Sequence, residues 1–271
     1  MRAWQVQELG EPLAVLREAD LAVPEAGPGQ VVVRTLATAA NFPDVLMCRG
    51  LYQVKPDLPF TPGVELCGEI TALGEGVEGF AVGDRVLGGA ALPAGGVGSA
   101  AIQLGKAAGA KVIGVVGGAD KAEVARALGA DVVVDRHTQD FVEVVKAETG
   151  GRGADVIYDP VGGENYKRST KCIAFEGRIL IVGFAGGTIQ EAALNHALIK
   201  NYSIVGLHWG LYNAFDPEAV QQCHRELTAL ADKGLVNPLV SERLSFDEVP
   251  DGLQRLADGT TVGRVVYQAA R

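Results

Sequence analysis

The first part of the chain carries short apolar runs that are rich in β-branched residues and are separated by glycine and proline. One of these runs contains Val31, Val32 and Val33 in succession, and such runs are typical of strands. The predicted strands cover residues 3–9, 30–39, 65–73 and 84–87. The pattern therefore predicts a β-rich domain in this part of the chain.

From residue 94 onward, apolar runs alternate with helical segments. Predicted strands lie at 111–116, 131–135, 154–161, 178–184 and 203–209, and predicted helices at 119–128, 138–149 and 164–174. Near-continuous apolar strands separated by helices are typical of a parallel sheet covered on both faces. An amphipathic helix is predicted at 217–233, and a final strand at 263–268. The chain is therefore expected to be of the mixed α/β class.

The composition indicates a globular protein that binds small molecules. Of the 271 residues, 48% are hydrophobic, which is enough for a sizeable core. The net charge is -9, so no basic surface offsets the charge of a nucleic-acid backbone. Polar residues interrupt the start of the chain, and no apolar run is long enough to span a bilayer. We expect a cytoplasmic protein with neither nucleic-acid nor membrane partners.

Four cysteines, Cys48, Cys67, Cys172 and Cys223, lie far apart and form no Cys-x-x-Cys pair. This spacing favours neither a disulfide framework nor a zinc knuckle. We interpret them as buried or inert thiols.

A glycine-rich turn opens the α/β part of the chain. Ala94, Gly95, Gly96, Val97 and Gly98 begin a helix that is predicted to run to about residue 108. Glycines at such a turn let the backbone approach a diphosphate, and the helix N-terminus offers free N–H groups to it. Many glycine clusters are only tight turns, but the position of this one within a series of βα units favours dinucleotide binding.

The end of the predicted strand at 111–116 bears on which dinucleotide binds. Chains that bind NAD usually have an acidic residue there, which bonds the ribose 2′-hydroxyl. This chain has Gly117 there, Lys121 follows shortly, and Arg136 follows the next strand. Two cations suit a 2′-phosphate, which favours NADPH over NADH. Solvated surface charges are the alternative, and Asp120 and Asp135 stand beside these cations.

Seven short segments, spread over almost the whole chain, form a recognisable series. They are Asn41-Phe42-Pro43-Asp44, Arg49-Gly50-Leu51-Tyr52, Pro62-Gly63-Val64-Glu65, Gly83-Asp84-Arg85-Val86, Ala94 to Gly98, Val182-Gly183-Phe184 and Val262-Gly263-Arg264-Val265-Val266. In order and spacing they resemble the zinc-free quinone oxidoreductases, the zeta-crystallin-like branch of the medium-chain dehydrogenases/reductases. The resemblance implies a GroES-like, β-rich catalytic domain at 1–93 and 211–271. It also implies a doubly wound parallel sheet, the Rossmann nucleotide-binding domain, at 94–210.

The resemblance also bears on metal binding. Zinc-dependent relatives have a histidine ligand at the position of Val64 and a cysteine ligand near the position of Asn41. Neither ligand is present in this chain. Because zinc prefers cysteine and histidine ligands, we expect no metal site.

The resemblance assigns Asn41, Asp44 and Tyr52 to the catalytic site, in the cleft where nicotinamide and substrate meet. Hydride transfer to a quinone or an enone requires a donor to the developing oxyanion and no nucleophile. Asn41 and Tyr52 can both donate. A turn-capping asparagine, a half-buried loop tyrosine and a structural Asp44 are the alternatives.

Further cofactor contacts are implied by the same resemblance. Gly183, Phe184 and Ala185 would pass the nicotinamide half of the cofactor, and Asn41 and Arg264 would also contact it. A glycine that only ends a strand and an arginine on the surface are the alternatives.

One stretch of the chain is much shorter than the family pattern. Only five residues, 89–93, separate Gly88 from Ala94. Relatives have there further strands of the β-rich domain, a helix and the first strand of the nucleotide fold. At roughly 5–6 residues per strand and ~11–12 per helix, the shortfall is on the order of fifty residues.

Two explanations of this shortfall are open. Either the molecule contains a segment that the printed sequence lacks, or the natural chain is shortened. In the second case residues 85–92 would have to serve as the central strand of the nucleotide sheet, and cofactor binding would be poor or absent. The predicted fold is the same in both cases, whereas the predicted activity is not.

The leading hypothesis is a reductase in which NADPH passes a hydride to a quinone or another α,β-unsaturated carbonyl compound. An enoyl-thioester reductase on the same scaffold is the nearest enzyme alternative, because the substrate pockets of such enzymes differ by loops. A catalytically idle nucleotide-binding relative is the alternative from another class, and the short stretch after Gly88 supports it. The resemblance also implies a homodimer.

Overall fold

The computed structural model describes residues 1–89 and 97–269 of the chain. The chain divides into two compact units: unit 1 comprises Met1–Gly96 and Leu239–Arg271, and unit 2 comprises Val97–Pro238. Among the described helices, none combines the length and the apolar composition needed to cross a bilayer.

The second boundary between the units differs from the one expected from the sequence, where the β-rich domain resumes at residue 211. A 3-10 turn, η1 (Trp209–Leu211), leads directly into α8 (Tyr212–Phe215), and α9 (Pro217–Asp232) follows and packs against α8. The rings of Trp209 and Tyr212 stack with their centroids 5.1 Å apart. These local contacts keep residues 211–238 in unit 2.

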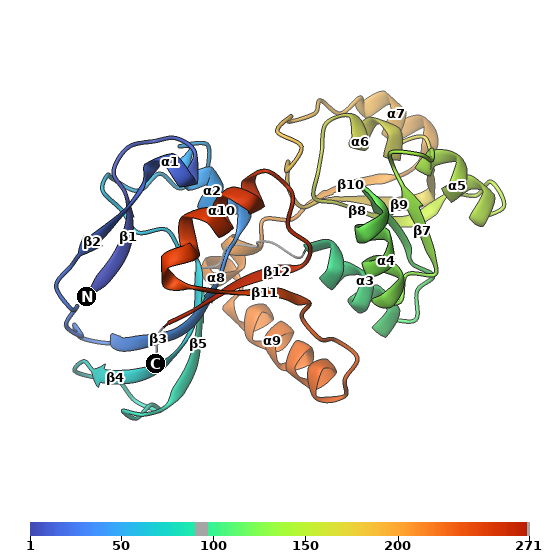
Figure 1. Cartoon of the computed structure of the whole chain (residues 1–271). Helices are drawn as coiled ribbons and strands as arrows, with labels where there is room; N and C mark the ends of the chain where they lie inside the picture. Colours follow the sequence, from blue (N-terminus) through green and yellow to red (C-terminus); the bar gives the residue numbers. More distant parts are fainter. Residues whose placement is uncertain (90–96, 270–271) are drawn as a thin grey trace. The chain divides into compact units, whose positions relative to one another are not determined.

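Unit 1 is built around a five-stranded sheet. Its strands are β3 (Val31–Ala39), β4 (Glu65–Leu73), β5 (Arg85–Gly89), β11 (Val240–Ser245) and β12 (Arg264–Gln268). The strand order is β11-β12-β3-β4-β5, in which β11 and β12 pair parallel and the other neighbours antiparallel. Figure 1 shows how β12, from the end of the chain, lies beside β3 from its beginning.

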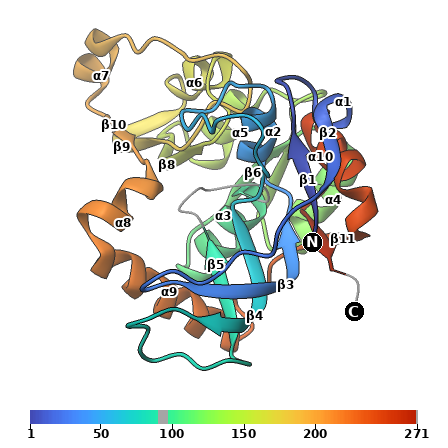
Figure 2. The ribbon, with the colours of Figure 1, turned by 90° about the vertical axis from the view of Figure 1, so that its left-hand side faces the viewer.

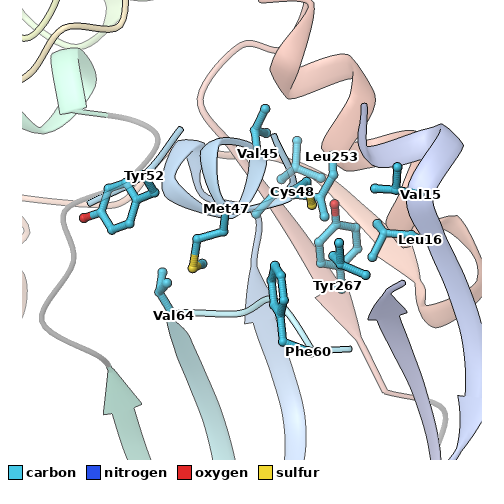
Figure 3. Packing of buried hydrophobic residues seen from close by; sticks show 13 residues of the cluster. Val15, Leu16, Val45, Met47, Cys48, Tyr52, Phe60, Val64, Leu253 and Tyr267 are labelled. Carbon is cyan, nitrogen blue, oxygen red and sulfur yellow. The ribbon is translucent and has the colours of Figure 1, made fainter. Parts of the chain in front are cut away.

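The helices of unit 1 close a single apolar core. They are α1 (Pro12–Val15), α2 (Phe42–Cys48), the 3-10 turn η2 (Phe246–Glu248) and α10 (Val249–Ala257), and β1 (Arg2–Val6) pairs with β2 (Leu16–Asp20) beside them. Val45 and Cys48 of α2 are fully buried and meet Leu253 of α10 and Tyr267 of β12 (Figure 3). The core thus joins residues that lie more than two hundred positions apart in the chain.

The strand β5 belongs to the sheet of unit 1 and not to the parallel sheet of unit 2. If the natural chain is shortened, residues 85–92 would have to serve as the central strand of the nucleotide sheet. Arg85–Gly89 instead pairs antiparallel with β4 in unit 1, with Leu87 opposite Cys67. For these residues the replacement is therefore wrong, and residues 90–92 lie outside the described part of the chain.

Unit 2 consists of parallel strands and helices, as predicted. Its strands are β6 (Ile113–Val116), β7 (Val132–Asp135), β8 (Ala154–Asp159), β9 (Ile173–Ile181) and β10 (Ser203–Gly206). Its remaining helices are α3 (Val97–Ala107), α4 (Ala119–Ala127), α5 (Phe141–Glu148), α6 (Glu164–Ser169) and α7 (Leu194–Lys200). In Figures 1 and 2, α6 covers one face of the sheet of β8, β9 and β10, and its Tyr166 packs against Ile179 of β9. The predicted fold class, a β-rich unit and a parallel α/β unit, is confirmed.

The parallel sheet differs from the expected one in continuity. In the described residues it forms two pieces, β6 with β7, and β8 with β9 and β10. β6 and β8 do not pair with each other, so each has one described neighbour. The resemblance implies that the shortfall after Gly88 removes the first strand of the nucleotide fold, and the division of the described sheet between β6 and β8 agrees with this expectation.

Several predicted elements end earlier than expected, including the strands predicted at 3–9, 154–161 and 178–184, which end at Val6, Asp159 and Ile181. The helix predicted at 164–174 ends at Ser169, because Ile173 already belongs to β9 and lies opposite Ala154 of β8. The strand predicted at 203–209 ends at Gly206, before the turn that begins at Trp209. At this last boundary the apolar residues continue past Gly206 to Leu207, so the apolar run alone does not mark the end of the strand.

Candidate functional site

The predicted catalytic residue Asn41 occupies a capping position. It is the N-cap residue of α2 and is fully buried. Its backbone N–H donates to Oδ2 of Asp44 (2.9 Å), and its side-chain Nδ2 donates to the carbonyl of Ala39 (3.0 Å). Pro43 in the first turn fits the helix start, where no backbone N–H is needed. The turn-capping alternative considered from the sequence thus describes the position of Asn41.

Arg264 holds the remaining polar atom of the Asn41 side chain. Its Nη1 donates to Oδ1 of Asn41 (2.8 Å) and also bonds Oε1 of Glu65. Arg264 begins β12 and Glu65 begins β4, so three separate elements meet at this guanidinium. The sequence predicted Arg264 as a cofactor contact, and in this structure its bonds go to Asn41 and Glu65.

Glu65 is a member of this network that the sequence reasoning missed. It stands 199 positions from Arg264 in the chain, and nothing in the letters pairs the two residues. The usable signal was an acidic residue at the start of a strand whose following residues are largely apolar, since a carboxylate in such a position usually has a partner.

Asp44 is the most perturbed carboxyl group of unit 1. Only 2% of the residue is exposed, and its Oδ1 has no hydrogen-bond partner among the described residues. Burial raises the pKa of Asp44 to about 7, and the nearby charge of Glu65 adds to the rise, whereas N–H groups of Asn41 and Gly63 oppose it. A carboxyl group with such a pKa can hold or release a proton near neutral pH.

Tyr52 lies beside α2 and is more buried than the sequence suggested. It is 7% exposed, and burial, followed by the charge of Asp44, raises the pKa of its hydroxyl. Figure 3 shows its hydroxyl directed away from the apolar cluster around Met47 and Val64. Asn41, Asp44 and Tyr52 therefore belong to one local region at α2, and their catalytic role stays a prediction.

The cysteines form no disulfide, and two of them are buried. Burial raises the pKa of the Cys48 thiol to about 12, with the charge of Asp44 adding to the rise. Burial also raises the pKa of Cys172. Thiols of raised pKa are poor nucleophiles at neutral pH.

In unit 2 the predicted 2′-phosphate residues gather where β6 and β7 end. A Cβ built on Gly117 would lie 2.9 Å from Nε2 of His137 and 3.1 Å from Nε and Nη2 of Arg136. Both side chains thus point to the backbone that follows β6, in space that only a glycine leaves open. Lys121 lies in the first turn of α4, next to this backbone. His137 was missed in the sequence, although it directly follows Arg136.

The neighbouring Asp135 bonds the backbone of two turns through Oδ1. That oxygen accepts from the backbone N–H groups of Gly118 and His137, both at 3.0 Å. These two bonds, the first from Gly118, lower the pKa of Asp135. The carboxylate thereby fixes the two turns on which Gly117 and His137 lie.

The residues predicted beside the nicotinamide half follow β9 and contact the loop that follows β8. Ala185 N–H donates to the carbonyl of Pro160 (3.0 Å), and a Cβ on Gly183 would lie 3.3 Å from the same oxygen. Phe184 is 41% exposed. Asp159, at the end of β8, was not singled out in the sequence; its Oδ1 accepts from two N–H groups of this loop, and its buried Oδ2 has no partner among the described residues.

The glycine turn is described only in part. Ala94, Gly95 and Gly96 lie outside the described residues, whereas Val97 and Gly98 open α3. A Cβ on Gly98 would meet no atom within 4 Å. Packing among the described residues therefore does not explain a glycine at 98, and its open side suits a ligand that approaches the backbone.

Two family models match the chain. A zinc-binding dehydrogenase model matches residues 96–225, and an alcohol dehydrogenase GroES-like domain model matches residues 27–135. These are the two domain types expected from the sequence. Within residues 1–89 and 97–269, no three His, Cys, Asp or Glu side chains gather as a metal site would require.

Full-length relatives and solved structures agree with these models. The chain is 32% identical to a quinone oxidoreductase-like protein 2 homolog of Nematostella vectensis, over 98% of this chain and 88% of that protein. It is similar to a quinone oxidoreductase of Pseudomonas syringae (27% identity, TM-score 0.87, 98% and 99% of the two chains). It is also similar to the Escherichia coli quinone oxidoreductase complexed with NADPH (25% identity, TM-score 0.89, 99% and 100% of the two chains).

The alignment with the Nematostella protein also measures the shortfall. It spans 324 positions, of which 98% of this 271-residue chain fills about 266, so about 58 positions are filled by the relative alone. This difference is similar in size to the shortfall expected after Gly88.

Proposed function

Because the chain belongs to the quinone oxidoreductase family of the medium-chain dehydrogenases/reductases, we propose that it reduces quinones or other α,β-unsaturated carbonyl compounds with NADPH, without a metal. The bound cofactor would supply the hydride. The observation that carries the proposal is the position of the Arg136 guanidinium at the backbone of Gly117, where a Cβ would lie 3.1 Å from its Nε and Nη2. The Escherichia coli relative whose structure contains NADPH supports the same cofactor.

The preference for NADPH over NADH follows from charge at the end of β6. A glycine there removes the carboxylate that would bond a ribose 2′-hydroxyl. A guanidinium matches the geometry and charge of a phosphate, and Lys121 adds a second cation. Oδ1 of Asp135 accepts from the backbone N–H groups of Gly118 and His137, and its charge also attracts Arg136, so a 2′-phosphate would share the guanidinium with this carboxylate.

The residues at α2 would act on the carbonyl oxygen. Asn41 uses one N–H of its amide on Ala39, which leaves the second N–H as a donor, and the Tyr52 hydroxyl is another. Such donors stabilise the negative charge that develops on the oxygen when a carbonyl is reduced. Asp44 would hold a proton near neutral pH. Val64, which replaces the histidine ligand of zinc-dependent relatives, supports a reaction without zinc.

Two alternatives stay in competition. An enoyl-thioester reductase would use the same scaffold on another substrate. A catalytically idle relative that binds nucleotide is favoured by one observation, the division of the described parallel sheet between β6 and β8. A homodimer and a cytoplasmic location are further parts of the proposal.

The activity is tested by following NADPH oxidation with a panel of quinones, 2-alkenals and enoyl thioesters. We expect turnover with the quinones or alkenals; turnover restricted to the thioesters would select the first alternative. Thermal shifts with NADPH and NADH accompany the assay, since a ligand stabilises the folded protein by mass action. A shift without turnover on any substrate would indicate the idle relative, and no shift with either nucleotide would reject dinucleotide binding.

A matched pair of variants tests the cofactor assignment. We expect Arg136→Ala to weaken NADPH binding and to leave NADH binding nearly unchanged, because its guanidinium would meet only the 2′-phosphate. Arg126→Ala removes an exposed cation from the last turn of α4 and should change neither. Equal losses for both nucleotides in the Arg136 variant would contradict the assignment.

A further inference from the structure

His137 is a titratable group that the proposed cofactor contacts do not include. It follows Arg136 in the turn after β7, and its side chain is exposed. Its Nε2 and the Arg136 guanidinium lie on the same side of the Gly117 backbone, each close to the place where a Cβ would be. An imidazole nitrogen and a guanidinium thus converge on one small space at the end of β6.

The backbone around His137 is held in place by a neighbouring side chain. Oδ1 of Asp135 accepts from the N–H of His137 and from the N–H of Gly118, both at 3.0 Å. The one carboxylate therefore links the turn that carries His137 to the residue that precedes α4. This link keeps the imidazole beside Gly117 without using the imidazole itself as donor or acceptor.

From these contacts we propose that His137 is a third ligand of the 2′-phosphate of NADPH, beside Arg136 and Lys121, and that its protonation makes the preference for NADPH over NADH depend on pH. This inference rests on the proposed function, because it requires that the dinucleotide binds at the end of β6. It goes beyond that function by assigning a residue and a pH response.

The direction of the pH response follows from the charges. A protonated imidazole attracts a phosphate, and a neutral one retains at most a single N–H donor. Histidine ordinarily loses its proton at about pH 6.5, and a phosphate monoester reaches its second charge at about pH 6. Between pH 6.5 and 8.5 the phosphate is thus mostly dianionic already, and affinity should fall as the imidazole loses its charge.

The other charged groups of this region come from three elements. Asp120 and Lys121 lie in the first turn of α4, Asp135 ends β7, and Arg136 follows it. The ordinary pKa values of these residue types lie far outside the range from 6.5 to 8.5. Asp44, with a pKa of about 7, lies in unit 1 at α2 and carries no specificity for the 2′-phosphate, so a change confined to 2′-phosphorylated ligands reports on the imidazole.

Calorimetric titration of the full chain provides the test. The dissociation constants of NADPH, NADH and adenosine 2′,5′-bisphosphate are measured at pH 6.5, 7.5 and 8.5 and at low salt. For the two 2′-phosphorylated ligands we expect about a three- to tenfold loss of affinity from pH 6.5 to 8.5. NADH affinity should change little over the same range.

The variant His137→Gln should abolish this pH dependence and weaken NADPH binding at pH 6.5, with little effect at pH 8.5. His224→Gln is the matched control, because His224 is exposed on α9, and it should behave as the unaltered chain. In a second variant, Gly117→Ala, the new methyl group would displace both side chains, and 2′-phosphorylated ligands should lose affinity selectively.

The outcomes separate this inference from the proposed function. If no dinucleotide binds at any pH, the proposed function fails and the inference with it. If the unaltered chain prefers NADPH but His137→Gln keeps the same affinity and pH dependence, only the role of His137 is overturned. A pH dependence shared equally by NADH would overturn it as well.

Discussion

Asp44 is the residue whose surroundings change its chemistry most. The carboxyl group is needed to bond the N–H of Asn41 at the start of α2, yet it is placed where its charge is poorly solvated. A capping carboxylate on the surface normally stabilises a helix start by its charge. Here burial opposes that charge, and the pKa of Asp44 rises to about 7.

This raised pKa predicts a pH dependence of stability. The folded protein keeps the Asp44 proton up to about pH 7, whereas an unfolded chain releases it near pH 3.9. The folded state therefore binds more protons between these values, and the free energy of unfolding falls as pH rises through them. Between pH 5 and pH 8 we expect a loss of about 2–3 kcal/mol from this group.

Chemical denaturation at pH 5 and pH 8 measures the effect. Asp44→Asn keeps an oxygen that can accept from the Asn41 N–H but carries no charge. The free energy of unfolding of this variant should therefore fall by about 2–3 kcal/mol less between pH 5 and pH 8 than that of the unaltered chain. Asp57→Asn, a change of an exposed residue in the same unit, should retain it. An equal fall in the Asp44 and Asp57 variants would show that the Asp44 charge is not buried in solution.

Removal of the Arg264 side chain should lower the free energy of unfolding by more than the loss of its partly exposed ion pair with Glu65 would. Removal of the guanidinium would leave Oδ1 of the fully buried Asn41 without its donor. We expect Arg264→Ala to reduce the free energy of unfolding by about 1–3 kcal/mol. Arg34→Ala removes a surface pair with Glu69 in the same sheet and should have a much smaller effect. Urea denaturation compares the two, and equal losses would indicate that Asn41 finds another donor.

At the scale of elements, the two pieces of the parallel sheet differ in how many neighbours each strand has. β9 pairs with β8 on one side and β10 on the other, whereas β6 and β8 each pair with one strand in the described part of the chain. Val115 of β6 and Val156 of β8 are 44% and 61% exposed, although such strands are normally buried on both faces. Edge strands present N–H groups without partners.

Hydrogen exchange resolved by NMR should therefore distinguish these strands. N–H groups of β6 and β8 that point away from their single neighbour should exchange at least ~10-fold faster than the interior N–H groups of β9. Uniform protection across β6, β8 and β9 would contradict this expectation and would show that both edges are covered in solution.

The strand and helix predictions were correct where the apolar pattern of an element and the residues that end it lie together in the sequence. The strand predicted at 65–73 is β4, because turns that contain glycine, Pro62-Gly63 before it and Gly74-Glu75-Gly76 after it, bound the run at both ends. The helix predicted at 217–233 is α9, with Asp216 as its capping residue. The helix α10 was missed, because it is only nine residues long and its few apolar residues do not form a clear helical pattern in the sequence. Their role becomes visible only in the structure, where they pack against the core of unit 1.

At the scale of the whole molecule, exposed apolar side chains support the proposed homodimer. α7 carries Leu194, Leu198 and Ile199, each more than 70% exposed. β10, which ends the described sheet beside it, has β9 as its described neighbour. A second copy of the chain would remove these side chains from water and give β10 a partner, as closed two-fold symmetry allows.

Light scattering coupled to size exclusion should accordingly give twice the 28.3 kDa of one chain. We expect the double change Leu198→Glu and Ile199→Glu to yield monomers, because a dimer would have to bury two charges on each chain. Val23→Glu, at an exposed position of unit 1, serves as the control and should remain dimeric. Dimers in all three proteins would place the interface elsewhere.

The sequence by itself determined the class of the chain, the order of its elements and the residues available for chemistry. These depend on local periodicity and on short segments, which are legible in the letters. The tertiary structure decided that Arg264 binds Asn41 and Glu65, that His137 meets Arg136 at Gly117, that Asp44 is buried, and that residues 211–238 belong with unit 2. Each of these depends on contacts between distant positions, or on the desolvation they cause, and neither quantity is a property of a short stretch of chain.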